Sequence, residues 1–156
     1  MNQRGVAREA EMNRQPNQDE RIMTAIAHGS IIAGGFGIVA AAIIWLTQRE
    51  RSGYVRFQAL QATAYQFVGM LATILAWTCW GCLYALSLIP LVRDPQAFED
   101  APPPIFWISL ISVILPIALM ALWWLYGLYA GLRTLQGHEF RYVWLGSVVR
   151  RYVADS

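Results

Sequence analysis

The stretch from Ile22 to Leu46 constrains the fold more than any other part of this sequence. It runs for about 25 residues without a single Lys, Arg, Asp or Glu side chain. An α-helix of that length rises by about 37 Å, which exceeds the roughly 30 Å thickness of a bilayer's hydrocarbon core. The stretch therefore predicts a transmembrane helix.

Small side chains recur at every fourth position along this predicted helix, so they would lie on one of its faces. A smooth strip of this kind allows a second helix to approach closely. Another pair with the same spacing occurs later in the chain. The predicted helix-packing positions are Ala25, Gly29, Ala33, Gly37, Ala41, Gly127 and Gly131.

The composition agrees with a membrane protein. Of the 156 residues, 56% are hydrophobic and 14% are charged, whereas soluble domains carry roughly 25% charged residues. The net charge of +2 gives no basic footprint for nucleic acid. All twelve basic residues are arginines. One membrane domain with short polar extensions is therefore expected.

Two further apolar segments, at about 64–91 and 105–132, complete the predicted domain. The fold class is all-α, a polytopic bundle of three transmembrane helices with amphipathic interfacial segments before the second span and after the third. Pro116 should kink the third span. The expected organisation is a flexible polar tail at 1–20, the transmembrane domain at 21–132 and an amphipathic tail at 133–156.

Three spans would place the two termini on opposite sides of the membrane. Seven arginines lie in the first connection and the C-terminal tail, and five lie in the N-terminal tail and the second loop. The positive-inside rule then places the C-terminus in the cytoplasm. The predicted location is the bacterial inner membrane.

Ionisable groups are rare inside the predicted spans. All ten Asp and Glu residues lie outside them, which argues against a self-contained pump or secondary transporter. Among the His, Arg, Asp and Glu residues, only His28 lies within a predicted span. It is either a functional group or a neutral imidazole that bonds to a neighbouring helix.

Other polar positions also allow two interpretations. Cys79 and Cys82 form a C-x-x-C spacing, but without a second pair they are better explained by packing. The stretch 53–62 is either an interfacial elbow or a helical turn that carries Gln61 inwards. The candidate polar positions are His28, Ser30, Arg56, Gln58, Gln61 and Gln66. No catalytic constellation, metal site or cofactor site is predicted.

Four short stretches resemble a known family. They are Ala27–Ser30, Ile43–Leu46, Tyr54–Ala62 and Gly137–Tyr142. Together they resemble the small bacterial membrane proteins related to the Tic-twenty component of chloroplast protein import. The chloroplast relatives have four spans where this sequence suggests three. The resemblance implies a helical membrane fold and, as one functional possibility, a role in protein transport.

Two functions remain open from the sequence. The first is a non-enzymatic accessory or packing subunit, whose partners are membrane lipids and either other membrane subunits or further copies of this chain. The alternative is a Tic-twenty-like component of a protein- or solute-conducting channel. Such a path would need a polar lining, for which the sequence offers only His28, Ser30, Gln61, Gln66 and Thr78.

Overall fold

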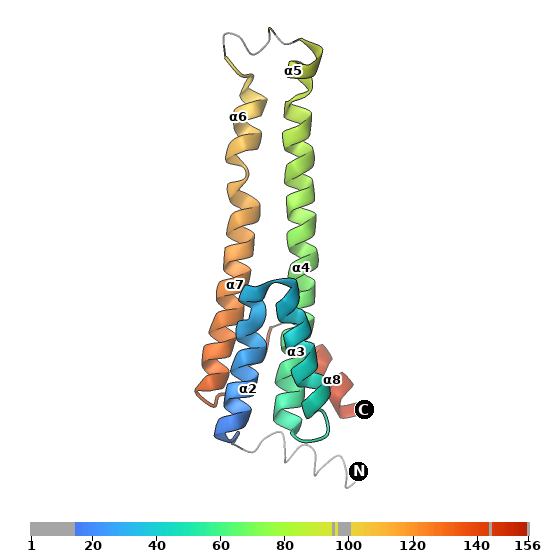
Figure 1. Ribbon diagram of the computed structural model, residues 1–156, viewed down its shortest axis with the longest axis vertical. Helices are drawn as coiled ribbons and strands as arrows, with labels where there is room; N and C mark the ends of the chain where they lie inside the picture. Colours follow the sequence, from blue (N-terminus) through green and yellow to red (C-terminus); the bar gives the residue numbers. More distant parts are fainter. Residues whose placement is uncertain (1–14, 95, 97–100, 144, 156) are drawn as a thin grey trace. The chain divides into compact units, whose positions relative to one another are not determined.

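The computed structural model describes residues 15–94, 96, 101–143 and 145–155. Helices make up the ordered elements of these residues, and no β-strand occurs among them (Figure 1). The elements are α2 (Gln18–Gly29), η1 (Ser30–Ala33), α3 (Gly35–Gln48), α4 (Gly53–Ser87), α5 (Ile89–Arg93), α6 (Pro104–Ile111), α7 (Ile114–Leu135) and α8 (Leu145–Asp155). The all-α prediction is confirmed. The predicted tail at 1–20 lies mostly outside the described residues.

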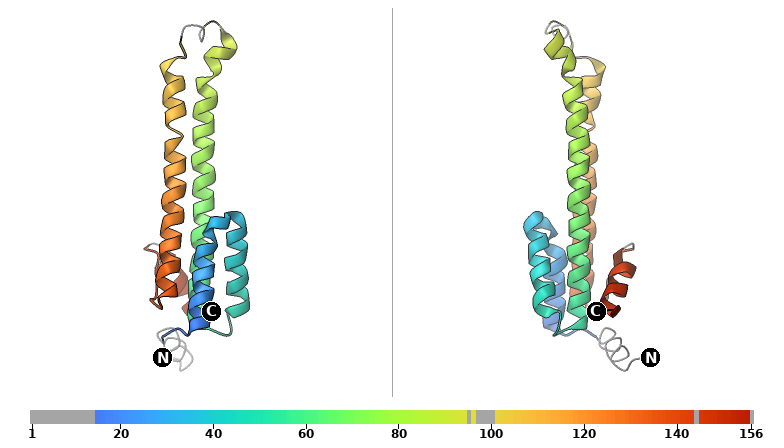
Figure 2. Two further views of the ribbon diagram at one scale, coloured as in Figure 1. Left: turned by 60° about the vertical axis from the view of Figure 1, so that its left-hand side comes forward. Right: turned by 90° about the vertical axis from the view of Figure 1, so that its right-hand side faces the viewer.

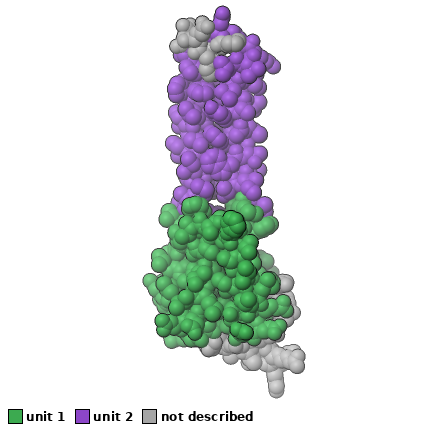
Figure 3. All heavy atoms as spheres, viewed as in Figure 1, with its two compact units in different colours: residues 1–70, 124–156 green, residues 71–123 purple. Residues whose placement is uncertain are grey.

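The chain divides into two compact units (Figure 3). Unit 1 comprises residues 1–70 and 124–156, and unit 2 comprises residues 71–123. The first half of α4 and the end of α7 therefore belong to unit 1. All six candidate polar positions lie in unit 1.

A capping box starts α2. The side chain of Asn17 accepts a hydrogen bond from the backbone N–H of Glu20, and the Glu20 carboxylate accepts one from the backbone N–H of Asn17. These two bonds satisfy N–H groups that the first turn of a helix leaves without partners. The helix thus begins a few residues before the apolar stretch, inside the segment predicted to be a flexible tail.

The prediction of one continuous helix from Ile22 to Leu46 is wrong. The chain forms α2, the short 3₁₀ helix η1 and α3 instead, and α2 and α3 lie side by side as a helical hairpin (Figures 1 and 2). With 12 and 14 residues, the two helices are about 18 and 21 Å long, so neither crosses a 30 Å core. Apolar length alone did not distinguish a spanning helix from two shorter ones.

The reversal depends on a glycine and on a hydroxyl group. Gly34 has φ 58° and ψ −128°, a conformation that side chains disfavour and glycine adopts readily. The Ser30 hydroxyl donates both to the Ala27 carbonyl, at 2.9 Å, and to the Gly37 carbonyl, at 3.0 Å. These bonds join the end of α2 to the first turn of α3.

Two helical segments are long and apolar enough to cross a membrane, Gly53–Arg93 and Pro104–Leu135. They contain the second and third predicted spans, and three transmembrane helices are not confirmed. The segment 53–62, for which the sequence allowed an interfacial elbow or an inward-facing helical turn, is the beginning of α4. Its inward side chains are fully buried in unit 1, including Val55, Gln58 and Gln61.

Pro116 interrupts the second of these segments. It has no N–H to donate to the Ser112 carbonyl, so that carbonyl accepts from Leu115 at 3.0 Å instead. The helix stops at Ile111 and resumes at Ile114. The expected kink is therefore a break between α6 and α7, located one turn before the proline.

Unit 1 is organised around the first half of α4. The α2–α3 hairpin packs on one side of it and α8 lies on the other (Figure 2, right). An alanine cluster joins the hairpin to α4, and Val149 of α8 packs with Phe57. The cluster consists of Ala27, Ala41, Ala59 and Ala62. Small side chains at this contact let the helices approach closely.

Candidate functional site

A buried polar network occupies the centre of unit 1, and it begins at His28. The imidazole is 1% exposed. Its Nδ1 lies 3.1 Å from the Tyr142 hydroxyl, and its Nε2 lies 3.1 Å from Oε1 of Gln58. One side chain of α2 therefore contacts both α4 and the segment that follows α7.

The network fixes the tautomer of His28. The Gln58 amide nitrogen donates to the Phe140 carbonyl at 3.0 Å, so its oxygen faces the imidazole as an acceptor. Nε2 of His28 must then carry the hydrogen, and Nδ1 must accept from Tyr142. His28 lies outside both candidate spans. Burial lowers its pKa from 6.5 to about 4, although the bond to Gln58 acts in the opposite direction. The imidazole is therefore neutral near pH 7.

Gln61 holds the backbone of the segment after α7. Its amide nitrogen donates to the Phe140 carbonyl at 2.9 Å, and its amide oxygen accepts from the Tyr142 N–H at 3.1 Å. The carboxamide thus pairs with two backbone groups as a neighbouring strand would. We call residues 138–143 the strap, because Gln58 and Gln61 bind it to α4.

Aromatic rings pack over the same network. Tyr142 stacks on Tyr65 with a centroid separation of 3.9 Å and an interplanar angle of 6°. Phe140 meets Tyr126 and Tyr129 edge to face. Such pairs add to the stabilisation that comes from burial alone. Burial raises the pKa of Tyr142 well above its usual value, so its hydroxyl remains a donor.

Gln66 of α4 forms hydrogen bonds to the hairpin turn. Its amide nitrogen donates to the Ala27 carbonyl at 2.8 Å and to the Ser30 hydroxyl at 3.2 Å. Gly37 packs against the same groups, because a Cβ at Gly37 would lie 2.0 Å from the Ser30 carbonyl oxygen and 2.9 Å from Oε1 of Gln66. The hairpin turn and α4 are thus joined without room for an added methyl group.

A further contact joins the outer ends of the same elements. The Ser52 hydroxyl donates to Oε1 of the buried Glu20 carboxylate at 2.6 Å. The Tyr54 hydroxyl lies 3.4 Å from the His138 carbonyl. The start of α2, the start of α4 and the segment after α7 therefore meet at one end of unit 1.

The predicted packing strip divides at the hairpin turn. The backbone at Ala25 and Gly29 lies against Gly131 of α7, where an added Cβ would be 3.3 Å from the Ala25 carbonyl oxygen and 3.5 Å from the Gly29 nitrogen. Gly127 lies against Ile31, because a Cβ added at Gly127 would be 2.7 Å from Cδ1 of Ile31. Ala41 belongs to the alanine cluster, and Ala33 is exposed. The positions do not form the single continuous face that the spacing suggested.

The other candidates are two cysteines, a threonine and an arginine on α4. Cys79 and Cys82 are exposed free thiols in the half of α4 that belongs to unit 2. Thr78 bonds back to the Ile74 carbonyl. Arg56 is partly buried on α4. Within the described ranges no group of three or more His, Cys, Asp or Glu side chains could hold a metal ion.

The comparison with protein families decides the assignment. Residues 19–149 match the model of the magnetosome magnetite crystal formation protein family. The chain belongs to that family. Members of the magnetosome magnetite crystal formation family are magnetosome membrane proteins involved in crystal formation, and the chain is accordingly a bacterial membrane protein. No curated protein matches the chain, and no solved structure does.

The family match shows that the assignment to Tic-twenty-like proteins was wrong. It gives no support to the channel function that this resemblance implied. The stretches that carried the resemblance contribute buried side chains to unit 1, including His28, Phe140 and Tyr142. These side chains pack the hairpin against the strap. Four of the polar side chains considered as a channel lining, His28, Ser30, Gln61 and Gln66, form hydrogen bonds inside unit 1.

Sequence reasoning missed several members of the network. Glu20 and Ser52 were assigned to a tail and a connection, and Tyr142 to an amphipathic tail. The N-x-x-E pattern at Asn17 was a usable signal for the start of α2. Tyr142 offered no local signal, because its partner His28 is 114 residues away.

Proposed function

We propose that this member of the magnetosome magnetite crystal formation family is a non-enzymatic accessory subunit of a magnetosome membrane assembly. Its role is to hold the arginine-bearing end of unit 1 as a rigid surface for other subunits while crystals form. The proposal combines the family's role with the way in which the buried polar groups are used.

One observation carries the proposal. His28, Gln58 and Gln61 are fully or almost fully buried, and their polar groups bond to one another and to the strap backbone. Catalysis or proton transfer needs titratable groups that reach a substrate or a water path. Here uncharged amides and a neutral imidazole join three chain segments, which is the arrangement expected of a scaffold.

The charges support an orientation for this scaffold. The hairpin returns the chain to the end of unit 1 where α4 begins, and α7 ends close to the same place. The arginines at that end are Arg21, Arg49, Arg51, Arg56, Arg133, Arg141, Arg150 and Arg151, whereas Arg93 is the last residue of the first candidate span. We infer by the positive-inside rule that this end faces the cytoplasm. The C-terminus would then lie on the cytoplasmic side as well.

A deletion strain tests the accessory role. Cells lacking the gene would be complemented with the wild-type chain, with Gln61→Leu or with the control Thr47→Val, whose hydroxyl bonds only within its own helix. Protein level in isolated magnetosome membranes, partners recovered in mild detergent and crystal dimensions by electron microscopy would be measured. We expect Gln61→Leu to recover fewer partner proteins and to give abnormal crystals even when both are normalised to its protein level, whereas Thr47→Val should behave as the wild type.

Two results would contradict the proposal. One is normal crystals in the deletion strain. The other is a wild-type protein that leaves the membrane as a lone monomer without partners while crystal growth still depends on it.

A further inference from the structure

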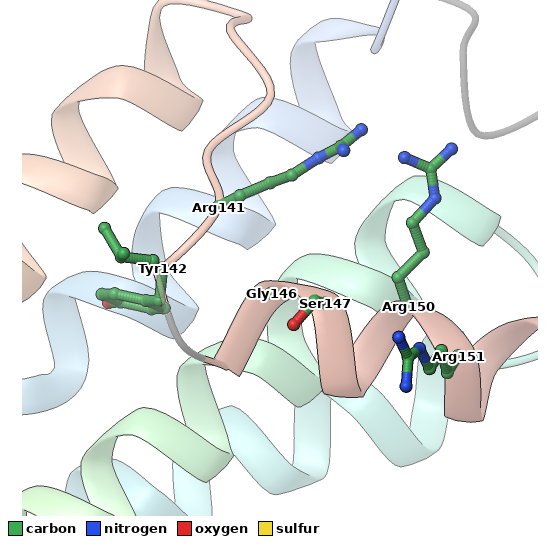
Figure 4. Close-up of a pocket in the computed structure, with 7 residues that line it drawn as sticks. Arg141, Tyr142, Gly146, Ser147, Arg150 and Arg151 are labelled. Atoms are coloured by element: carbon green, nitrogen blue, oxygen red, sulfur yellow. The ribbon is translucent and has the colours of Figure 1, made fainter.

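A cleft with three arginines lies between the strap and α8 (Figure 4). Its volume is about 550 Å³. It is lined by Arg141, Tyr142, Val143, Gly146, Ser147, Arg150 and Arg151. The guanidinium groups of Arg141 and Arg150 extend from the strap and from α8 towards the same side (Figure 4). The accessory function proposed above includes the arginines of this cleft in a surface for other subunits but assigns the cleft no ligand of its own.

The cleft walls are held by the buried network, so the arginines project from fixed backbone. Tyr142, at the inner wall, is 3% exposed and tied to His28 and Gln61. Val149 packs on Phe57, which turns the opposite face of α8 outwards. A Cβ on Gly146 would lie 2.9 Å from Oε1 of Gln61 and 3.1 Å from Cβ of Arg141. Glycine at this position lets α8 approach the strap closely.

The charges of the cleft suit a phosphate ester. Glu139 binds Arg141 through Nε and Nη2, at 2.8 and 3.0 Å. That pairing uses two of the five N–H donors of a guanidinium group and holds its plane in place. Arg150 and Arg151 bring two further guanidinium groups, and the Ser147 hydroxyl adds a neutral donor. Guanidinium groups bind phosphate oxygens through paired donors.

The position of the cleft favours a lipid as the source of that phosphate. The second candidate span ends at Leu135, only a few residues before the strap. Val143, which lines the cleft, is 80% exposed, and Val148 on α8 is 63% exposed. Exposed apolar side chains beside arginines are typical of helices that lie at the headgroup level. A soluble phosphate compound has no acyl chains that could cover these valines.

We propose that this cleft binds the phosphate of an anionic phospholipid headgroup, with Arg141, Arg150 and Arg151 as its ligands. The acyl chains would run beside Val143 and Val148. The inference does not depend on the accessory function, because a lipid site could serve any membrane protein of this fold.

Native mass spectrometry of the full chain in detergent tests the site. Phosphatidylglycerol, phosphatidylcholine and inorganic phosphate would be titrated separately into the wild-type protein. The cleft variant would carry Arg141→Gln, Arg150→Gln and Arg151→Gln. A matched control with Arg49→Gln, Arg51→Gln and Arg133→Gln loses the same charge from the same end of unit 1.

We expect the wild-type protein and the matched control to retain phosphatidylglycerol in preference to phosphatidylcholine. The preference should fall by about tenfold or more in the cleft variant, because it lacks the three guanidinium groups that would bind the phosphate oxygens. Equal losses in both variants would overturn the proposal in favour of diffuse surface charge. Displacement of the lipid by millimolar inorganic phosphate would overturn the lipid assignment.

Discussion

Tyr142 donates a hydrogen bond from its hydroxyl to Nδ1 of His28 across 3.1 Å, although 114 residues separate the two in sequence. The bond joins the strap to the hairpin, and Gln58 bonds to the other side of the same imidazole. Because the ring is buried and neutral, each of its nitrogens has a defined role, one as donor and one as acceptor. Loss of either partner leaves a buried polar atom unsatisfied.

The variant Tyr142→Phe should therefore reduce stability. The ring can still stack on Tyr65, but Nδ1 of His28 loses its donor, which costs about 1–3 kcal/mol for a buried group. Unfolding by denaturing detergent would measure the change. Tyr129→Phe is the control, because that ring also packs on Phe140 and is 51% exposed. Equal losses in the two variants would contradict the assigned bond.

Gln61 should control the strap specifically. Gln61→Leu keeps similar bulk but removes the donor to the Phe140 carbonyl and the acceptor for the Tyr142 N–H. We expect faster hydrogen exchange at Tyr142 and a loss of about 1–3 kcal/mol. Thr63→Val on the same helix is the control, because the Thr63 hydroxyl bonds only to the Ala59 carbonyl of its own helix. Unchanged exchange at Tyr142 would show that Gln61 does not hold the strap.

Two glycines of the predicted strip should respond in opposite ways to replacement by alanine. A Cβ on Gly37 would lie 2.0 Å from backbone oxygen, whereas a Cβ on Gly29 would meet nothing within 4 Å. We expect Gly37→Ala to cost about 2 kcal/mol or more, as overpacking of a tight contact does. Gly29→Ala should be neutral or slightly stabilising, because alanine favours a helix. Unfolding in denaturing detergent measures both. Equal responses would argue against the hairpin turn described here.

The pH dependence of stability should carry the signature of His28. An unfolded chain binds a proton at His28 near pH 6.5, whereas the folded protein binds one only near pH 4. The unfolding free energy should therefore fall as the pH drops from 6.5 to about 4, and the contribution of His28 should level off below that. The full change is roughly 3 kcal/mol. Comparison with His28→Gln over this range isolates the effect, and parallel curves would contradict it.

The sequence predicts the helical class and both of the long apolar segments, because hydrophobic length is a local property. It also allows an inward Gln61, since the 3.6-residue period of a helix at 53–64 carries that side chain to the face of Phe57 and Ala64. The structure adds that the inward face of this helix contacts the strap through Gln61. Pro116 was a correct signal for an interruption, although the break occurs a turn earlier.

The hairpin could not be derived in the same way. A straight helix and a hairpin can be built from the same apolar sequence, and glycines serve close packing and positive φ equally well. What separates the two is the bond from the Ser30 hydroxyl to the Gly37 carbonyl, which forms only once α3 has folded back. The same holds for the strap, whose partners lie on α2 and α4.

Cysteine accessibility offers the most direct test of the corrected topology. In a background with Cys79→Ser and Cys82→Ser, single cysteines would be placed at the exposed positions Gln18, Arg49 and Ala101. Gln18 opens α2, Arg49 follows α3, and Ala101 lies between the two candidate spans. If α2 and α3 form a hairpin, Gln18→Cys and Arg49→Cys react with an impermeant maleimide from the same side of sealed vesicles.

Vesicles of known orientation then assign that side. We expect labelling of Gln18→Cys and Arg49→Cys only in inside-out vesicles, because the positive-inside rule places the arginine-bearing end in the cytoplasm. Ala101→Cys should react only in right-side-out vesicles. A continuous helix from Ile22 to Leu46 makes a different prediction, since it would put Gln18 and Arg49 on opposite faces of the membrane. Labelling of these two positions from opposite sides would therefore exclude the hairpin and restore three spans.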